Sequence, residues 1–207
     1  SGQTTGTTTT RPPVTTTTST SQGATDSMTD QPDGLRCETL TDFEDAESNG
    51  RWAVVNDDVM GGRSLGGLAF VDGALLFEGD INTNGGGFAS LRLALEPEAL
   101  VGADHIRFRA RPDGRDYMVT FDDNLSSRDR RVSHRAPIGF DGAGEWQTVS
   151  VAFADLFPAI FGQPVDDLPF RPDLATRLGL MISDGRDGPF RLDVDRIELC
   201  QDPEPAS

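Results

Sequence analysis

Short stretches of alternating apolar and polar residues recur along most of this chain, and Gly, Asp and Pro separate them. Alternation with a period of two is typical of β-strands with one buried face, and no helical period appears beyond short turns near residues 152–157 and Ile160. Asp72-Gly73 joins two stretches with a pair that tight hairpin turns favour. The pattern predicts many antiparallel strands. The predicted strands are residues 68–70, 74–79, 88–95, 105–111, 117–121, 147–153, 178–183 and 190–199.

Four clusters of glycines and polar residues interrupt this pattern. Residues 52–64 pass from a strand-like run into Asn, two Asp and a Gly-Gly pair, and residues 84–92 place three glycines before the next alternation. Residues 113–117 and 182–190 each contain Asp-Gly-Arg-Asp or a close variant. In this order and spacing the clusters resemble the complex I intermediate-associated protein 30 family, over about residues 40–199. The resemblance implies an all-β jelly-roll β-sandwich, galactose-binding-domain-like, with an assembly or binding role.

The charge of the chain excludes several classes of function. The 18 basic residues are all arginine, and 34 acidic residues give a net charge of -16. Such acidity argues against a nucleic-acid partner, since phosphate backbones require concentrated positive charge. The absence of lysine excludes a Walker-type phosphate loop and Schiff-base catalysis.

Nothing in the sequence marks an enzyme. The two histidines, His105 and His134, have no zinc-type spacing. Residues 62–66 match the letters G-x-S-x-G, but no helical period follows them, so no serine is expected in the strand-turn-helix elbow of a hydrolase. The many carboxylates are compatible with a glycosidase, but no pair of them stands out as general acid and nucleophile. We therefore expect a non-catalytic protein that needs no cofactor.

The chain divides into three parts by composition. Residues 1–33 are rich in Thr and too polar to form a core, so they are predicted to be a disordered stalk or linker. Residues 34–201 are predicted to form one β-sandwich domain, followed by a disordered tail at residues 202–207. No stretch has the length and apolar character of a transmembrane segment. A Thr-rich stalk is typical of exported proteins, which predicts a secreted or surface-tethered location outside the cytoplasm, and a monomer.

Cys37 and Cys200 lie just outside the first and last strand-like runs. If the terminal strands are neighbours, the two residues can form a disulfide that closes a long loop, and an extracellular compartment would favour it. The alternative is two unpaired thiols in a reducing compartment. We expect the disulfide.

The interrupting clusters also supply a candidate binding site. For the first cluster, residues 56–64, the alternative to a binding site is an ordinary turn, in which the Asn and Asp side chains accept hydrogen bonds from nearby backbone amides. Arg92 has two interpretations as well: an ion pair within the fold, or a bidentate anchor for a carboxylate or sugar hydroxyls. We expect the cluster residues to converge in space. The candidate binding residues are Asn56, Asp57, Asp58, Arg63, Ser90, Arg92 and Asp184.

Acidic residues near both ends of the domain raise the question of a metal. Glu44, Asp193 and Asp195 offer the oxygen ligands that a structural calcium requires, and a metal-free network of salt bridges is the alternative. Arginines at residues 107, 109 and 111 fall on one strand face and are expected to pair with acids across the sheet, with an anion-binding strip as the alternative.

Aromatic residues bear on the choice of ligand. Trp52 and Trp146 are expected to be buried, which leaves few rings on which a sugar could stack. The Phe- and Pro-rich residues 153–170 are expected to be either a structured loop over one end of the sandwich or an exposed docking patch.

Two functions follow. The first is an exported, non-enzymatic binding module that recognises a glycan or a protein partner through the polar site. The second is an assembly factor for a respiratory, complex I-like or other membrane protein complex, with residues 153–170 holding partly folded subunits.

Overall fold

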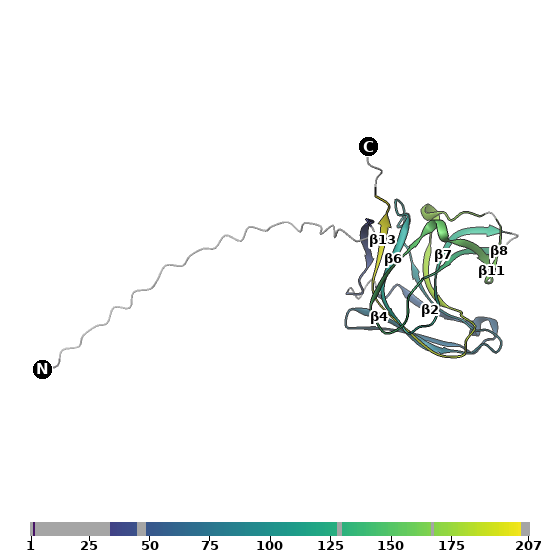
Figure 1. Cartoon of the computed structure of the whole chain (residues 1–207), viewed down its shortest axis with the longest axis horizontal. Helices are drawn as coiled ribbons and strands as arrows, with labels where there is room; N and C mark the ends of the chain where they lie inside the picture. The colour runs from purple at the N-terminus through teal and green to yellow at the C-terminus, as the bar shows by residue number, and fades with distance from the viewer. Residues whose placement is uncertain (1, 3–33, 45–48, 128–129, 167, 204–207) are drawn as a thin grey trace.

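The protein is described by a computed structural model, which covers residues 2, 34–44, 49–127, 130–166 and 168–203. Figure 1 shows two β-sheets packed against each other. No helix in this part of the chain is long and apolar enough to cross a membrane. Nearly all of the predicted stalk and the end of the predicted tail lie outside the described residues.

The first sheet has six strands. Its order is β3-β4-β13-β6-β9, and all pairs are antiparallel. The long strand β13 pairs with β4 through its first half and with β1 through its last residues. The strands are β1 (Arg36–Thr41), β3 (Leu65–Val71), β4 (Ala74–Ile81), β6 (His105–Pro112), β9 (Gln147–Ala152) and β13 (Gly188–Gln201).

The second sheet has seven strands in the order β11-β10-β8-β7-β12-β5-β2. These strands are β2 (Trp52–Asn56), β5 (Ala89–Ala94), β7 (Tyr117–Ser127), β8 (Arg130–Pro137), β10 (Phe157–Ile160), β11 (Gln163–Pro164) and β12 (Arg177–Ile182). The described residues also form three short 3-10 helices: η1 (Asp57–Met60), η2 (Phe153–Asp155) and η3 (Pro172–Leu174).

The core lies between the sheets, as alternation requires. Every second residue of a central strand points inward, so Leu91 of β5 and Leu180 of β12 are fully buried. From the six-stranded sheet, Phe77 and Phe108 fill the opposite side. The predicted all-β sandwich of the galactose-binding-like, jelly-roll type is confirmed.

Local sequence placed most strands correctly. Asp72 and Gly73 both have positive φ and join β3 to β4 in a hairpin, as the pair predicts. Strand β8 was missed because one of its inward positions carries His134, which is fully buried and breaks the apolar alternation. The histidine contacts the Asp123 carboxylate and the Leu168 carbonyl.

The Phe-rich residues 153–170 pack against the core. Phe153 and Phe170 pack against Phe121, with ring centroids 5.5 and 4.9 Å away, so the segment is ordered against the core as the structured-loop interpretation expects. It is not a loop throughout, because β10 and β11 form within it at the edge of the seven-stranded sheet. Phe161 is the exception, since 71% of it is exposed. The guanidinium of Arg130 lies over its ring.

The expected disulfide is present. Cys37 of β1 lies opposite Cys200 of β13 and is bonded to it, so the first strand is tied covalently to the last. Both residues lie in neighbouring strands because β13 extends beyond the end of β4 and leaves room for β1.

Candidate functional site

Asp57, from the most distinctive cluster, is a fully buried carboxylate that organises three loops. It accepts hydrogen bonds from the backbone amide of Ser64 at 2.8 Å, the Ser64 hydroxyl at 2.6 Å and the backbone amides of Gly87 and Phe88 at 2.6 and 3.3 Å. Burial by itself would raise the pKa of Asp57, but these hydrogen bonds outweigh it and lower the pKa. Asp57 is therefore an ionised structural centre with its acceptors engaged inside the fold.

The glycines of the same clusters are explained by this carboxylate. A Cβ added at Gly62 or at Gly86 would overlap the side chain of Asp57. The adjacent Asn56 makes a second link, since its amide oxygen accepts from the Gly66 amide at 3.0 Å and its nitrogen donates to the Gly66 carbonyl at 3.3 Å. Because Asn56 ends β2 and Gly66 lies in β3, this pair joins the two sheets.

The other two clusters, residues 113–117 and 182–190, are joined by a second network of hydrogen bonds and an ion pair. Arg115 donates from Nε and Nη2 to the two carboxylate oxygens of Asp184, both at 2.7 Å, and from Nη1 to the carbonyls of Gly188 and Pro189. Hydrogen bonds from Arg115 hold the pKa of Asp184 well below its usual range. The Asp113 carboxylate belongs to the same network, since it accepts hydrogen bonds from the Tyr117 hydroxyl and the Arg191 backbone amide.

The predicted site residues thus occupy different surroundings. Asn56, Asp57 and Asp184 are engaged by the fold itself, while Asp58 and Arg63 are exposed on the loop that contains η1. Only two of the candidates, Ser90 and Arg92, line a common pocket. In the part of the chain that the structure describes, no hydrogen bond or ion pair joins Asp57 or Asp184 to Arg92.

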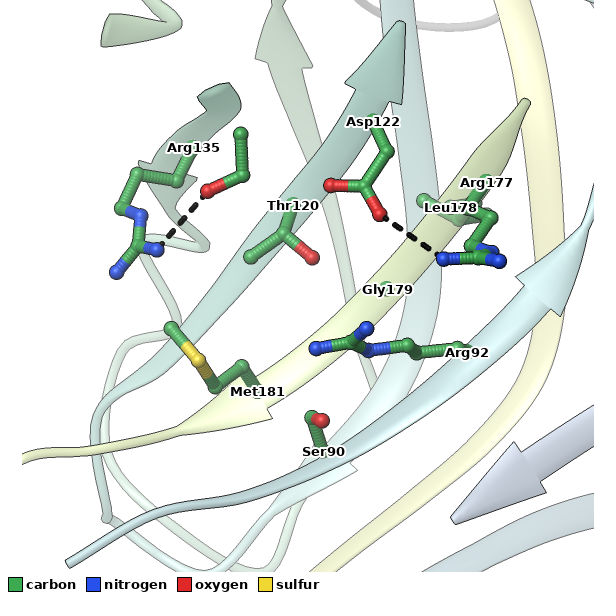
Figure 2. Close-up of a pocket in the computed structure, with 10 residues that line it drawn as sticks. Ser90, Arg92, Thr120, Asp122, Arg135, Arg177, Leu178, Gly179 and Met181 are labelled. Atoms are coloured by element: carbon green, nitrogen blue, oxygen red, sulfur yellow. Dashed lines mark hydrogen bonds and ion pairs between the residues drawn. The ribbon is translucent and has the colours of Figure 1, made fainter. Parts of the chain in front are cut away.

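That pocket lies on the face of the seven-stranded sheet that is turned away from the core. Antiparallel register aligns Arg92, Gly179, Thr120 and Arg135 in one row across β5, β12, β7 and β8. Figure 2 shows the Arg92 side chain extending over β12 toward the middle of the sheet. We call this hollow the arginine pocket. Its lining residues are Ser90, Arg92, Thr120, Asp122, Ser133, Arg135, Arg177, Leu178, Gly179 and Met181.

Gly179 makes the hollow in the middle of the row. A Cβ at this position would overlap the hydroxyl oxygen of Thr120 on β7. The absence of a side chain at Gly179 lets the Thr120 hydroxyl lie over β12 as part of the pocket floor, and the cavity volume is about 40 Å³. A glycine in a central strand commonly marks such a close approach.

The arginine pocket has more cations than anions. Arg177 contacts the Asp122 carboxylate at 3.6 Å, and Arg135 donates to the Ser133 hydroxyl at 3.0 Å. The buried Nε of Arg135 has no hydrogen-bond partner among the described residues, and Arg92 makes neither a hydrogen bond nor an ion pair there. Burial lowers the pKa of Arg135, opposed by the charge of Asp122. The pocket therefore has free donors for an anion.

Sequence reasoning found Ser90 and Arg92 but missed the rest of the pocket. The available signal was the polar half of the alternation in the predicted strands, Thr120 in residues 117–121 above all. Arg135 had no such signal because its strand was missed.

Two of the three acidic residues proposed for calcium form ion pairs with arginines. Asp193 pairs with Arg111 and Arg191 at 2.9 Å, and Asp195 pairs with Arg109. Within the described ranges no three His, Cys, Asp or Glu residues are grouped closely enough to hold a metal ion. The cross-strand ion pairs expected for the β6 arginines are present, and they engage Asp193 and Asp195. A structural calcium at Glu44, Asp193 and Asp195 stays a prediction.

The two tryptophans differ. Trp52 is buried as expected, but the expectation for Trp146 is wrong, since 37% of it is exposed. The guanidinium carbons of Arg109 and Arg111 lie 5.1 and 5.2 Å from its ring centroid. Its face is thus occupied by cations rather than free for a sugar.

In architecture the chain is similar to carbohydrate-binding modules. A family 11 module from Clostridium thermocellum, in complex with a β-1,3-1,4-mixed-linked tetrasaccharide, has a TM-score of 0.60 and 15% identity, covering 82% of this chain and 98% of the module. The family 11 module of cellulosomal cellulase Lic26A-Cel5E from the same organism has a TM-score of 0.61 and 13% identity, covering 83% and 99%. This likeness defines the class of fold.

Residues 41–194 match the family model of complex I intermediate-associated protein 30, CIA30. The chain belongs to this family. The mouse protein named "Complex I intermediate-associated protein 30, mitochondrial" is 28% identical over 181 residues, which cover 78% of this chain and 55% of that protein. A probable counterpart in Caenorhabditis elegans is 29% identical over 103 residues, covering 47% and 29%. The chain matches little more than half of the mouse protein's length and less of the nematode's.

The expected secreted or surface-tethered location is contradicted by these relatives. The mouse protein and its probable counterparts in Caenorhabditis elegans and Caenorhabditis briggsae are named as mitochondrial. The expectation depended on the Thr-rich composition of residues 1–33. Composition of that kind reports that a segment cannot form a core, and linkers in any compartment share it.

Proposed function

We propose that this chain is a non-catalytic binding protein of the assembly-factor type, which holds a protein partner on the outer face of its seven-stranded sheet. The observation that carries the proposal is the set of free donors in the arginine pocket. Arg92 has no partner among the described residues, and the buried Nε of Arg135 has none. Arg92 is partly exposed, so its donors are available for charge-assisted hydrogen bonds to an anionic group of a partner.

The structural roles of Asp57 and Asp184, the buried acids of the family clusters, support a non-catalytic function. Asp57 and Asp184 hold loops together through hydrogen bonds inside the fold. Neither has spare acceptors arranged around a reacting group, and His134 is buried away from the pocket. Their chemistry is structural, which favours a scaffold over an enzyme.

The names of the relatives indicate which kind of partner to propose. They are named for their association with complex I intermediates, and this chain shares the domain with them. We infer that its partner is a protein subunit of a respiratory or similar complex during assembly. Holding such a subunit requires an open surface with both polar and apolar contacts, as the seven-stranded sheet offers.

The test is capture of subunits from solubilised mitochondrial membranes. The purified chain is immobilised, and bound complex I subunits are quantified by mass spectrometry. A face variant, Arg92→Glu with Arg177→Glu, is compared with the control Arg196→Glu, an exposed arginine on the other sheet. The proposal expects enrichment of complex I subunits by the wild type and the control, and loss with the face variant. Absence of enrichment, or equal capture by all three, would refute it.

A glycan is the alternative ligand for the arginine pocket. The architecture is that of modules that bind sugars, but the arginine pocket is lined by neither Trp nor Tyr. Affinity electrophoresis in a gel containing mixed-linked β-glucan measures this directly. Retardation that the Arg92→Glu change abolishes would replace the protein partner with a carbohydrate.

A further inference from the structure

The rows of side chains beside the arginine pocket define what kind of ligand would fit it. Register places Arg92, Gly179, Thr120 and Arg135 in one row. Strands in a sheet lie about 4.8 Å apart, so the backbones of Arg92 and Arg135 are separated by roughly 14 Å. Two long cationic side chains thus flank a hollow that contains a hydroxyl and no bulky group.

The charge of this row is opposite to that of the molecule. Three arginines line the pocket against the single carboxylate of Asp122, while the whole chain carries a net charge of -16. Elsewhere many arginines are paired with acids, for example Arg111 with Asp193. A cationic hollow in such an acidic protein selects for an anionic group, and a guanidinium fork matches a carboxylate in geometry.

The next row adds apolar contacts. Met181 of β12 lies opposite Met118 of β7, and Ser90 of β5 lies on its other side. Both methionines are partly exposed. Flexible, polarisable methionine side chains are typical of surfaces that bind varied peptides, whereas sugar rings prefer flat aromatic faces. The two adjacent rows therefore favour a peptide with a carboxylate beside an apolar side chain.

We infer that the arginine pocket binds the carboxylate of a glutamate or aspartate in an extended segment of the partner protein, with a neighbouring apolar side chain of that segment on Met118 and Met181. This inference rests on the proposed function and names the chemistry that its partner would present. Arg92 and Arg135 hold the carboxylate from two sides, and Thr120 donates from the floor. Asp122 orients Arg177 and excludes a second anion nearby.

The experiment uses an array of peptides of ~8 residues, long enough to cross the sheet. Each peptide combines two glutamates with different apolar residues and stands beside a copy in which glutamine replaces glutamate. Binding is measured by fluorescence anisotropy with the purified full chain at low and high salt. We expect glutamate peptides to bind about 10-fold more tightly or better than their glutamine copies, and high salt to reduce the difference.

Variants localise the site. Arg92→Gln and Arg135→Gln should each weaken binding of the glutamate peptides about 10-fold, while Arg196→Gln on the other sheet should leave it unchanged. Thermal melts check that all three variants fold. If glutamate and glutamine peptides bind alike, if neither binds, or if Arg196→Gln is as harmful as Arg92→Gln, the inference is overturned.

The two proposals fail separately. Capture of complex I subunits without any preference for glutamate would leave the proposed function and remove the carboxylate recognition. Binding of a polyuronate oligosaccharide in place of the peptides would also overturn the inference, because the anion would then belong to a sugar.

Discussion

Gly62 lies directly against the buried carboxylate of Asp57, so closely that a Cβ at Gly62 would overlap it. The same holds for Gly86, which comes from the loop before β5. Two of the four family clusters are therefore one structural unit: a carboxylate surrounded by backbone amides that only glycine allows to come close. This unit ties the loop after β2 to the loops before β3 and β5.

Asp57→Asn should destabilise the protein by about 2–4 kcal/mol, because a neutral amide cannot accept from all the donors that surround it. Urea denaturation followed by tryptophan fluorescence measures the change. The matched control is Asp80→Asn, an exposed carboxylate of β4, which should change stability by about 0.5 kcal/mol or less. Similar losses in both variants would contradict the structural role of Asp57.

Arg115→Lys should cost about 2–4 kcal/mol, since one ammonium cannot reproduce a bidentate contact with Asp184 and the donation to nearby carbonyls. The comparison is Arg186→Lys, whose more exposed side chain contacts the same carboxylate. Thermal and chemical denaturation should rank Arg115→Lys as clearly more harmful. Equal effects would show that Asp184 does not depend on Arg115.

The lowered pKa of Asp184 predicts how stability depends on pH. The ordinary value is 3.8, and hydrogen bonds from Arg115 keep the folded pKa below it. The unfolded chain therefore takes up this proton first, so the stabilisation is complete above about pH 5 and is lost as the pH falls through the folded pKa. The free energy of unfolding of Asp184→Asn should fall less steeply than that of the wild type between about pH 5 and pH 2. Parallel curves would contradict the prediction.

Gly179→Ala should destabilise the protein by about 1–3 kcal/mol, because the added methyl group overlaps the Thr120 hydroxyl oxygen. Thr120→Ala in the same chain removes that oxygen and should recover much of the loss. The two single variants and the double variant form a thermodynamic cycle, measured by thermal denaturation. Additive effects would mean that the two residues do not meet.

Loss of the Cys37–Cys200 disulfide should cost about 2–5 kcal/mol, because the bond closes a loop of 163 residues in the unfolded chain. The variant Cys37→Ser with Cys200→Ser tests this by chemical denaturation. Adding a reductant should lower the stability of the wild type to that of the variant and leave the variant unchanged. A reductant effect on the variant would point to a different cause.

Local sequence determined most of the central strands and the hairpin turn at Asp72-Gly73, but it did not predict β1, β10 or β11. Alternation marks β4, β6 and β12 because one face of each strand must be apolar to reach the core, and Asp72-Gly73 supplies the positive φ of a tight turn. Alternation did not predict strand β8, because His134 occupies one of its inward positions. A buried histidine satisfied by hydrogen bonds can occupy a core position, and nothing nearby in the sequence reveals its partners.

Only the tertiary structure decided what the polar clusters do. Asp57 and Asp184 are acids that sequence alone assigns equally well to a ligand or to a turn, and the choice depends on donors that arrive from distant loops. The arginine pocket has the same origin. Ser90 and Arg92 of β5 meet Arg135 of β8 and Arg177 of β12 because strand order and register align them, and these depend on how the whole core packs rather than on any neighbouring residue.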